Sequence, residues 1–136
     1  GVEEMIGDFR LAYGKAHGSE ALARIKVHTK LVPDLARLAT VDRGYIRPIV
    51  ETSLTRLRTD RLDLVQFHWW DYRVPGLVPA ALALRELQQE GLIAHLGGTN
   101  FDSARTLDML EAGVPLVSMQ VQYSLLDRRP RMRSPR

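Results

Sequence analysis

Residues 46–68 have the sequence IRPIVETSLTRLRTDRLDLVQFH, and this stretch decides the fold class. Apolar side chains at positions 46, 49, 50, 54 and 57 fall on one face of an amphipathic helix. Pro48 is compatible with that helix only within its first turn. The run from Leu62 to Phe67 is short, apolar and bounded by polar residues, which is typical of a buried β-strand. The stretch therefore predicts a helix that leads into a strand.

The same alternation extends over the rest of the chain. Apolar runs at 25–31, 92–96 and 117–121 predict three more strands, and each interval between strands is long enough for one helix. A further helix is expected over 2–11, before the first strand. The order is therefore αβαβαβαβ, with no internal linker, and residues 1–126 form one domain.

Two of the predicted helices are bounded by capping residues. One ends at Gly91, because glycine readily takes the left-handed conformation that follows a helix C-terminus. The next begins at an N-cap supplied by Asp102 or Ser103 and ends at Gly113. The leucines expected to be buried by these two helices are Leu84, Leu87, Leu107 and Leu110.

Strands that alternate with helices imply parallel pairing through right-handed crossovers. An open doubly wound sheet and an arc of a (β/α)8 barrel both have this order. A nucleotide-binding open sheet has a glycine-rich turn after its first strand, whereas residues 32–35 here are VPDL. The pattern therefore favours an α/β fold that is a partial (β/α)8 TIM barrel with four parallel strands.

Polar side chains lie at the end of every predicted strand, where a barrel places its chemistry. They are Lys30, His68, Asn100 and Gln120. Each alone has an ordinary explanation: a rim charge, a half-buried imidazole, a helix cap or a polar residue along a strand. Together, at one edge of a sheet, they predict a functional site.

Composition narrows the class of protein. The 136 residues are 45% hydrophobic and 26% charged, which excludes a disordered or fibrous chain. The absence of cysteine excludes disulfides and thiolate metal sites and fits a reducing compartment. No apolar run approaches the ~20 residues of a membrane helix, and residues 1–4 lack signal-peptide features. We therefore expect a cytoplasmic protein without a bound metal.

Positive charge is confined to the C-terminal end. Residues 127–136 hold five arginines and one aspartate, a net charge of +4, whereas the whole chain carries +3, so residues 1–126 carry −1. We expect 127–136 to be a disordered basic tail. Because the rest of the chain is nearly neutral, neither a nucleic acid nor a membrane is expected as a partner, although the tail could contact phosphates.

Three segments resemble the aldo-keto reductases. Residues 51–69 (ETSLTRLRTDRLDLVQFHW) are similar to that family's helix, Asp-Leu strand and His-Trp strand end. Residues 84–101 (LRELQQEGLIAHLGGTNF) resemble the next helix, the glycine turn and the G-x-S-N-F segment. Residues 119–130 (MQVQYSLLDRRP) resemble the following strand and its exit. The similarity runs in order from about residue 1 to 130.

The resemblance implies a barrel that binds a nicotinamide dinucleotide, usually NADPH and otherwise NADH, and that reduces aldehydes or ketones. It implies that Lys30 lowers the pKa of the family's tyrosine acid and that His68 orients the substrate carbonyl. Trp69 would form a wall of the substrate pocket. The residues implied to hold the nicotinamide carboxamide are Thr99, Asn100 and Gln120.

The chain also departs from the family pattern. A (β/α)8 domain typically takes about 250 residues, and this chain has 136. The family's Asp-x-x-x-x-Tyr-Gly segment is expected just before residue 1. Asp8 and Tyr13 reproduce that spacing, but the residues before Asp8 are predicted to be helical, so we do not assign Tyr13 as the proton donor. Trp70 and Thr99 stand where many members have Pro and Ser, and the aromatic residues of 69–72 (WWDY) hint at an apolar or sugar-stacking pocket.

Half a barrel would leave its first and last strands as open edges. We therefore expect marginal stability, self-association through those edges, or a fragment that is inactive alone. The alternative function is a non-catalytic, truncated or regulatory relative that keeps only the scaffold.

Overall fold

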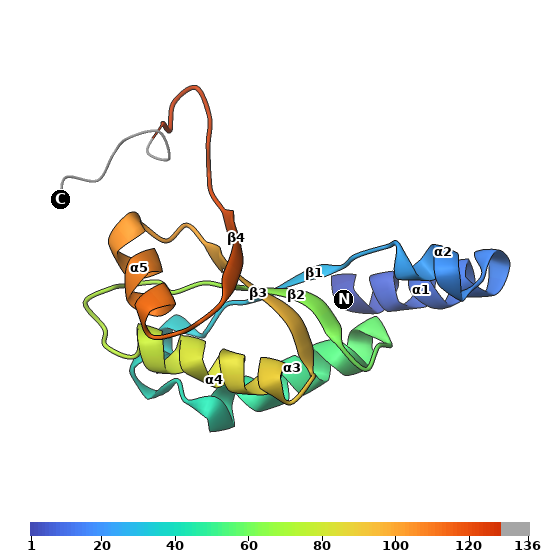
Figure 1. Ribbon diagram of the computed structural model, residues 1–136, viewed down its shortest axis with the longest axis horizontal. Coiled ribbons are helices and arrows are strands. Elements are labelled where there is room, and N and C mark those ends of the chain that lie inside the picture. The colour runs from blue at the N-terminus through green and yellow to red at the C-terminus, as the bar shows by residue number, and fades with distance from the viewer. Residues whose placement is uncertain (129–136) are drawn as a thin grey trace.

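Four parallel strands form one sheet in a computed structural model, which describes residues 1–128 (Figure 1). They lie side by side in sequence order: β1 (His28–Leu31), β2 (Leu62–Phe67), β3 (Ile93–Thr99) and β4 (Leu116–Gln120). All three neighbouring pairs are parallel, which confirms the predicted order and direction. The expected basic tail lies outside the described residues from position 129 onward.

The helices alternate with these strands as predicted. They are α1 (Val2–His17), α2 (Ser19–Ala23), the 3₁₀ helix η1 (Leu35–Thr40), α3 (Arg43–Leu57), α4 (Leu77–Gln89) and α5 (Ser103–Glu111). Helix α1 is longer than the expected 2–11. Figure 1 shows α3 and α4 side by side along one face of the sheet, with α5 toward β4 and α1 extending beyond β1.

The hydrophobic core lies between the sheet and these helices. Successive strand side chains point to opposite faces, so Val65 and Phe67 of β2 face the helices and are buried. They belong to the same buried cluster as Val50 of α3 and the predicted Leu84 and Leu87 of α4. The opposite face carries more accessible polar side chains, those of His28, Gln66 and His95.

The predicted burial of the α5 leucines is wrong. Leu107 is 54% exposed and Leu110 43% exposed, whereas Met109 between them is fully buried. Helix α5 contacts α4, and Met109 is the α5 residue that belongs to the buried cluster. Leu107 and Leu110 therefore do not lie on the side of α5 that meets the core. The predicted N-cap is confirmed, because Asp102 accepts a hydrogen bond from the Arg105 N–H at 2.7 Å.

Helix α3 begins earlier than the apolar spacing indicated. Asp42 caps it by accepting the Tyr45 N–H at 2.8 Å, so Pro48 lies inside the helix rather than in its first turn. A proline there leaves the carbonyl four residues earlier, that of Gly44, without its helical partner. Gly44 is exposed, so water can satisfy this oxygen. The expected position of Pro48 is therefore corrected.

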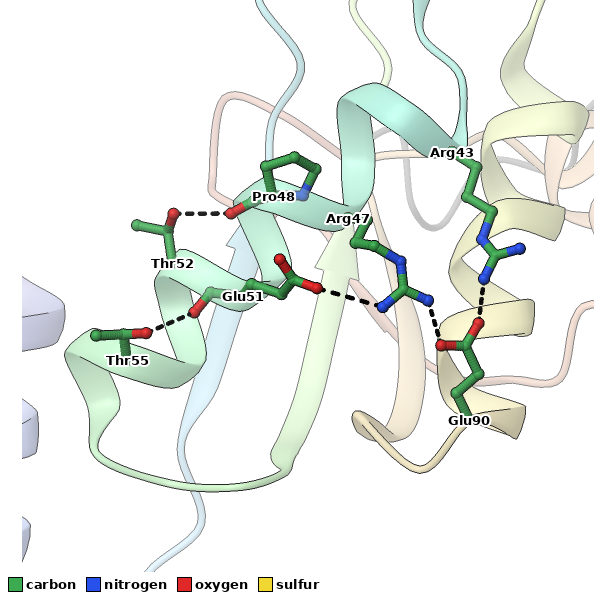
Figure 2. A network of polar contacts seen from close by, with 7 residues as sticks. All are labelled: Arg43, Arg47, Pro48, Glu51, Thr52, Thr55 and Glu90. Atoms are coloured by element: carbon green, nitrogen blue, oxygen red, sulfur yellow. Dashed lines mark hydrogen bonds and ion pairs between the residues drawn. The ribbon is translucent and has the colours of Figure 1, made fainter.

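Charged side chains join α3 to the end of α4 (Figure 2). Arg43 and Arg47 both contact the Glu90 carboxylate, and Arg47 also lies 3.3 Å from Glu51. The hydrogen bond from Arg47 lowers the pKa of Glu90 below its ordinary value. This network ties the two helices together on their outer surface.

Both outer strands have an unpaired edge within residues 1–128. Strand β1 pairs only with β2, and β4 only with β3. The open edges expected for a partial barrel are therefore present. None of the helices in the described part of the chain is long and apolar enough to cross a membrane.

Candidate active site

The four polar residues singled out from the sequence all lie at the carboxyl edge of the sheet. Lys30 pairs with Gln66 one position before the end of β1, and Gln120 ends β4 opposite Thr99. The backbone N–H of His68 donates to Leu31 O at 3.0 Å, extending the ladder beyond β2. The backbone N–H of Asn100 donates to Gln120 O at 2.8 Å. The parallel sheet thus brings these residues to one edge, as predicted.

His68 is half-buried and links β2 to β3. Its Nδ1 atom lies 3.3 Å from the carbonyl oxygen of Thr99. Because a carbonyl oxygen can only accept, Nδ1 is the protonated nitrogen in this contact. The Nε2 atom is therefore the ring nitrogen available to another partner.

The amide-bearing residues sit at the ends of β3 and β4. Asn100 adopts a left-handed backbone with φ 56°, a conformation that Asn tolerates better than most residues. Its Oδ1 accepts the Gln122 N–H at 2.8 Å, which leaves its NH2 group to donate elsewhere. Both Asn100 and Gln120 are exposed. Thr99 is 6% exposed, and its hydroxyl has no hydrogen-bond partner among residues 1–128.

Trp69 is not on the open side of this edge. Strand alternation turns it toward the helices, where it is 2% exposed and its ring lies 5.9 Å from that of Phe67. Its Nε1–H donates to the carbonyl oxygens of Asp71 and Val74, at 3.1 and 3.2 Å. The role of pocket wall expected for Trp69 is therefore corrected: Trp69 is a core residue that supports the loop after β2.

Trp70, rather than Trp69, is the tryptophan whose ring contacts His68. Its ring meets the His68 ring edge to face, with centroids 4.7 Å apart and planes at 90°. Its Nε1–H donates to Pro33 O at 2.7 Å, which spans the loops after β1 and β2, and it is 52% exposed. The aromatic run at 69–72 indicates from the sequence that a ring lies near the candidate site, but it does not show which ring that is.

Tyr72 was not assigned a role from the sequence. Its hydroxyl donates to Asn100 O at 3.3 Å, and its ring stacks on Phe101 with centroids 6.3 Å apart. Partial burial, together with the negative charge of Asp102, raises the pKa of Tyr72. The contact fixes the β2–α4 loop against the end of β3.

The loop is also held by Asp71. Its carboxylate accepts hydrogen bonds from the side chain and the backbone N–H of Arg73. These bonds lower the pKa of Asp71 to about 2. The carboxylate is therefore charged over the whole physiological range.

Lys30 is exposed on the edge strand, and no hydrogen bond or ion pair to its ammonium occurs within residues 1–128. Asp8 and Tyr13, which imitate the family's Asp-Tyr spacing, both lie in α1; the helix was expected around Asp8, and it extends past Tyr13. Asp8 pairs with Arg58 at 2.5 Å, and the Tyr13 ring contacts His17. Neither residue is part of the strand-end cluster.

Comparison with known proteins identifies the family. The Aldo/keto reductase family matches residues 1–134. The Bacillus subtilis aldo-keto reductase YhdN is 34% identical over 129 residues, which cover 93% of this chain and 37% of that protein. The NADH-specific methylglyoxal reductase of Escherichia coli is 37% identical over 86 residues, covering 61% of this chain and 26% of that protein.

Solved structures give the same result. The thermostable aldo-keto reductase Tm1743 is similar with a TM-score of 0.75 at 29% identity, over 95% of this chain and 43% of that one. The holo form of AKR11C1 from Bacillus halodurans has a TM-score of 0.70 at 32% identity, over 95% of this chain and 40% of that one. The chain thus spans about two fifths of the length of such relatives, which confirms a partial (β/α)8 barrel. It belongs to the aldo/keto reductase family.

Proposed function

We propose that the strand-end residues of this chain, from Lys30 on β1 to Gln120 on β4, form one side of an aldo-keto reductase active site. That site transfers hydride from NAD(P)H to an aldehyde or ketone. The observation that carries the proposal is the placement of Lys30, His68, Asn100 and Gln120 at one edge of a parallel sheet in a member of this family. A barrel site is built from the carboxyl ends of several strands, so this edge is where substrate and cofactor would meet.

The residues at β3 and β4 fit a nicotinamide carboxamide. That group carries one acceptor oxygen and two donor hydrogens, and it needs partners of both kinds. Asn100 has an NH2 group left to donate, and Gln120 offers both an acceptor and a donor. The buried Thr99 hydroxyl is a further uncommitted group beside them. The bound dinucleotide would supply the hydride.

Two side chains would assist the transfer. The free Nε2 atom of His68 would orient and polarise the substrate oxygen, and it donates a hydrogen bond when the ring carries a second proton. The Lys30 ammonium would favour the deprotonated form of the family's tyrosine acid, which we expect before residue 1. The acid itself would protonate the new alkoxide.

Several narrower expectations belong to the same proposal. The dinucleotide is NADPH, with NADH as the alternative, and the substrate is a small carbonyl compound. The protein acts in the cytoplasm, without nucleic-acid or membrane partners, and self-associates through the edges of β1 and β4.

A chimera tests the proposal. Residues 1–128 would replace the corresponding segment of YhdN, so that the rest of that protein supplies the missing strands. We expect the chimera to oxidise NADPH in the presence of an aldehyde, and the isolated 136-residue chain to show no turnover. A folded chimera that binds NADPH but has no activity would instead favour the non-catalytic scaffold.

A further inference from the structure

We propose that Trp70 is the specificity-determining residue of this site and forms an aromatic wall that selects carbonyl compounds carrying an aromatic ring. This inference rests on the proposed function, because the substrate oxygen is placed at His68.

Location is the first argument. The Trp70 ring is the aromatic group in direct contact with the His68 ring, at 4.7 Å between centroids. A substrate whose carbonyl oxygen reaches Nε2 of His68 therefore brings its first substituent close to the indole. Trp69, by contrast, is buried on the helix side and cannot touch a substrate held at that edge.

Rigidity is the second argument. The indole Nε1–H is committed to Pro33 O at 2.7 Å, so the ring is anchored at its polar edge. The loop that carries it is fixed by the Trp69 indole bonds, the Asp71 to Arg73 contacts and the Tyr72 hydroxyl. A ring that is already ordered loses little conformational entropy when a ligand stacks on it.

Chemistry is the third argument. Trp70 is 52% exposed, and its one polar atom already has a partner, so the accessible surface of the side chain is apolar and aromatic. Aromatic pairs gain affinity beyond the area they bury, in offset-stacked or edge-to-face geometry. An aromatic ketone should therefore bind better than a saturated one of the same size.

Two ketones of matched size test this on the full 136-residue chain without cofactor. Acetophenone and cyclohexyl methyl ketone have the same carbon skeleton size, and the ring is aromatic in the first and saturated in the second. In a chain with 15N-labelled tryptophan, acetophenone should shift the indole signal of Trp70 and leave that of Trp69 in place. Trp70→Phe assigns the two signals, because it removes one of them.

The variants then separate stacking from structure. Trp70→Leu should weaken acetophenone binding about 3- to 10-fold, the size of an aromatic pair contribution, and change cyclohexyl methyl ketone binding less than about 2-fold. Trp70→Phe keeps an aromatic ring, so its affinity for both ketones should stay close to that of the wild type. If the leucine variant fails to fold, Trp70→Phe still tests whether an aromatic ring at this position maintains the preference for acetophenone. Binding in the leucine variant is followed through the backbone amide of Asn100.

Equal losses for both ketones, equal shifts of both indole signals, or no binding of acetophenone would overturn the proposal. The ketone-binding experiment needs no cofactor and no turnover, so its result does not depend on catalysis. If acetophenone binds at Trp70 but the YhdN chimera binds NADPH without turnover, the proposed function fails and the assignment of Trp70 stands.

Discussion

Replacing Gly7 with alanine should destabilise the chain, although alanine favours a helix over glycine by about 1 kcal/mol. Gly7 is buried where α1 packs against α3. A Cβ atom at this position would lie 2.1 Å from the backbone oxygen of Arg56 and 3.2 Å from its carbonyl carbon. This oxygen belongs to the main chain of α3, so it cannot rotate away. Helix α1 must therefore move outward by roughly 1 Å to restore an ordinary contact.

The size of the effect follows from what that movement disturbs. It would loosen the contact of Ile6 with the core, the Asp8–Arg58 pair and the hydrogen bond from Thr29 to Glu3. Overpacking of this kind costs about 1–3 kcal/mol. After the gain in helix propensity is subtracted, we expect a net loss of up to about 2 kcal/mol in the free energy of unfolding.

Gly14→Ala is the matched control in the same helix. Its Cβ would meet the Leu22 Cδ2 atom at 3.1 Å, the end of a flexible side chain that can turn aside. This variant should be as stable as the wild type or gain up to about 1 kcal/mol. Urea unfolding followed by far-ultraviolet circular dichroism measures both. A Gly7→Ala chain as stable as Gly14→Ala would refute the close approach of α1 and α3.

Other expectations concern catalysis, acid stability and the core. In an active YhdN chimera, Lys30→Met should lower the rate of chemistry by about 10²–10⁴-fold and move the alkaline limb of the pH–rate profile upward, since removal of the ammonium raises the tyrosine pKa. His68→Phe should lower kcat/KM with NADPH affinity nearly unchanged; wild-type rates in both stable variants would remove the two assignments. The hydrogen bond from Arg47 holds the pKa of Glu90 below its ordinary 4.5. The contact between Glu90 and Arg47 therefore stabilises the fold fully above pH 4.5, and this stabilisation is lost as the pH falls through the lowered pKa. Acid titration should therefore show a smaller loss of stability in Glu90→Gln, and an unchanged curve would contradict this. Phe67→Ala should lower the free energy of unfolding by about 3–5 kcal/mol in a urea titration, because the ring is 1% exposed; a loss below 1 kcal/mol would show that its surroundings collapse around it.

Local patterns predicted most of the secondary structure. The helix and strand of 46–68 follow from apolar spacing, and the cap at Asp102 follows from residue type. Burial on α5 did not follow, because a helix with two apolar faces does not reveal which of them meets the core. Met109, Leu107 and Leu110 are all apolar, so residue type does not show that Met109 is the buried one. The start of α3 was missed because the Asp42 cap determines it, not the apolar face that begins at Ile46.

The sequence by itself determined that strands and helices alternate and that a polar residue ends each strand, since both depend on neighbours along the chain. It also determined the family, through the similarity of 51–69, 84–101 and 119–130 in order. Only the tertiary structure decided which of two adjacent tryptophans faces the site. Strand alternation turns Trp69 into the core, and the bond to Pro33, a residue 37 positions away, holds Trp70 beside His68. Contacts between loops that follow different strands leave no local pattern, so they cannot be predicted from residue order.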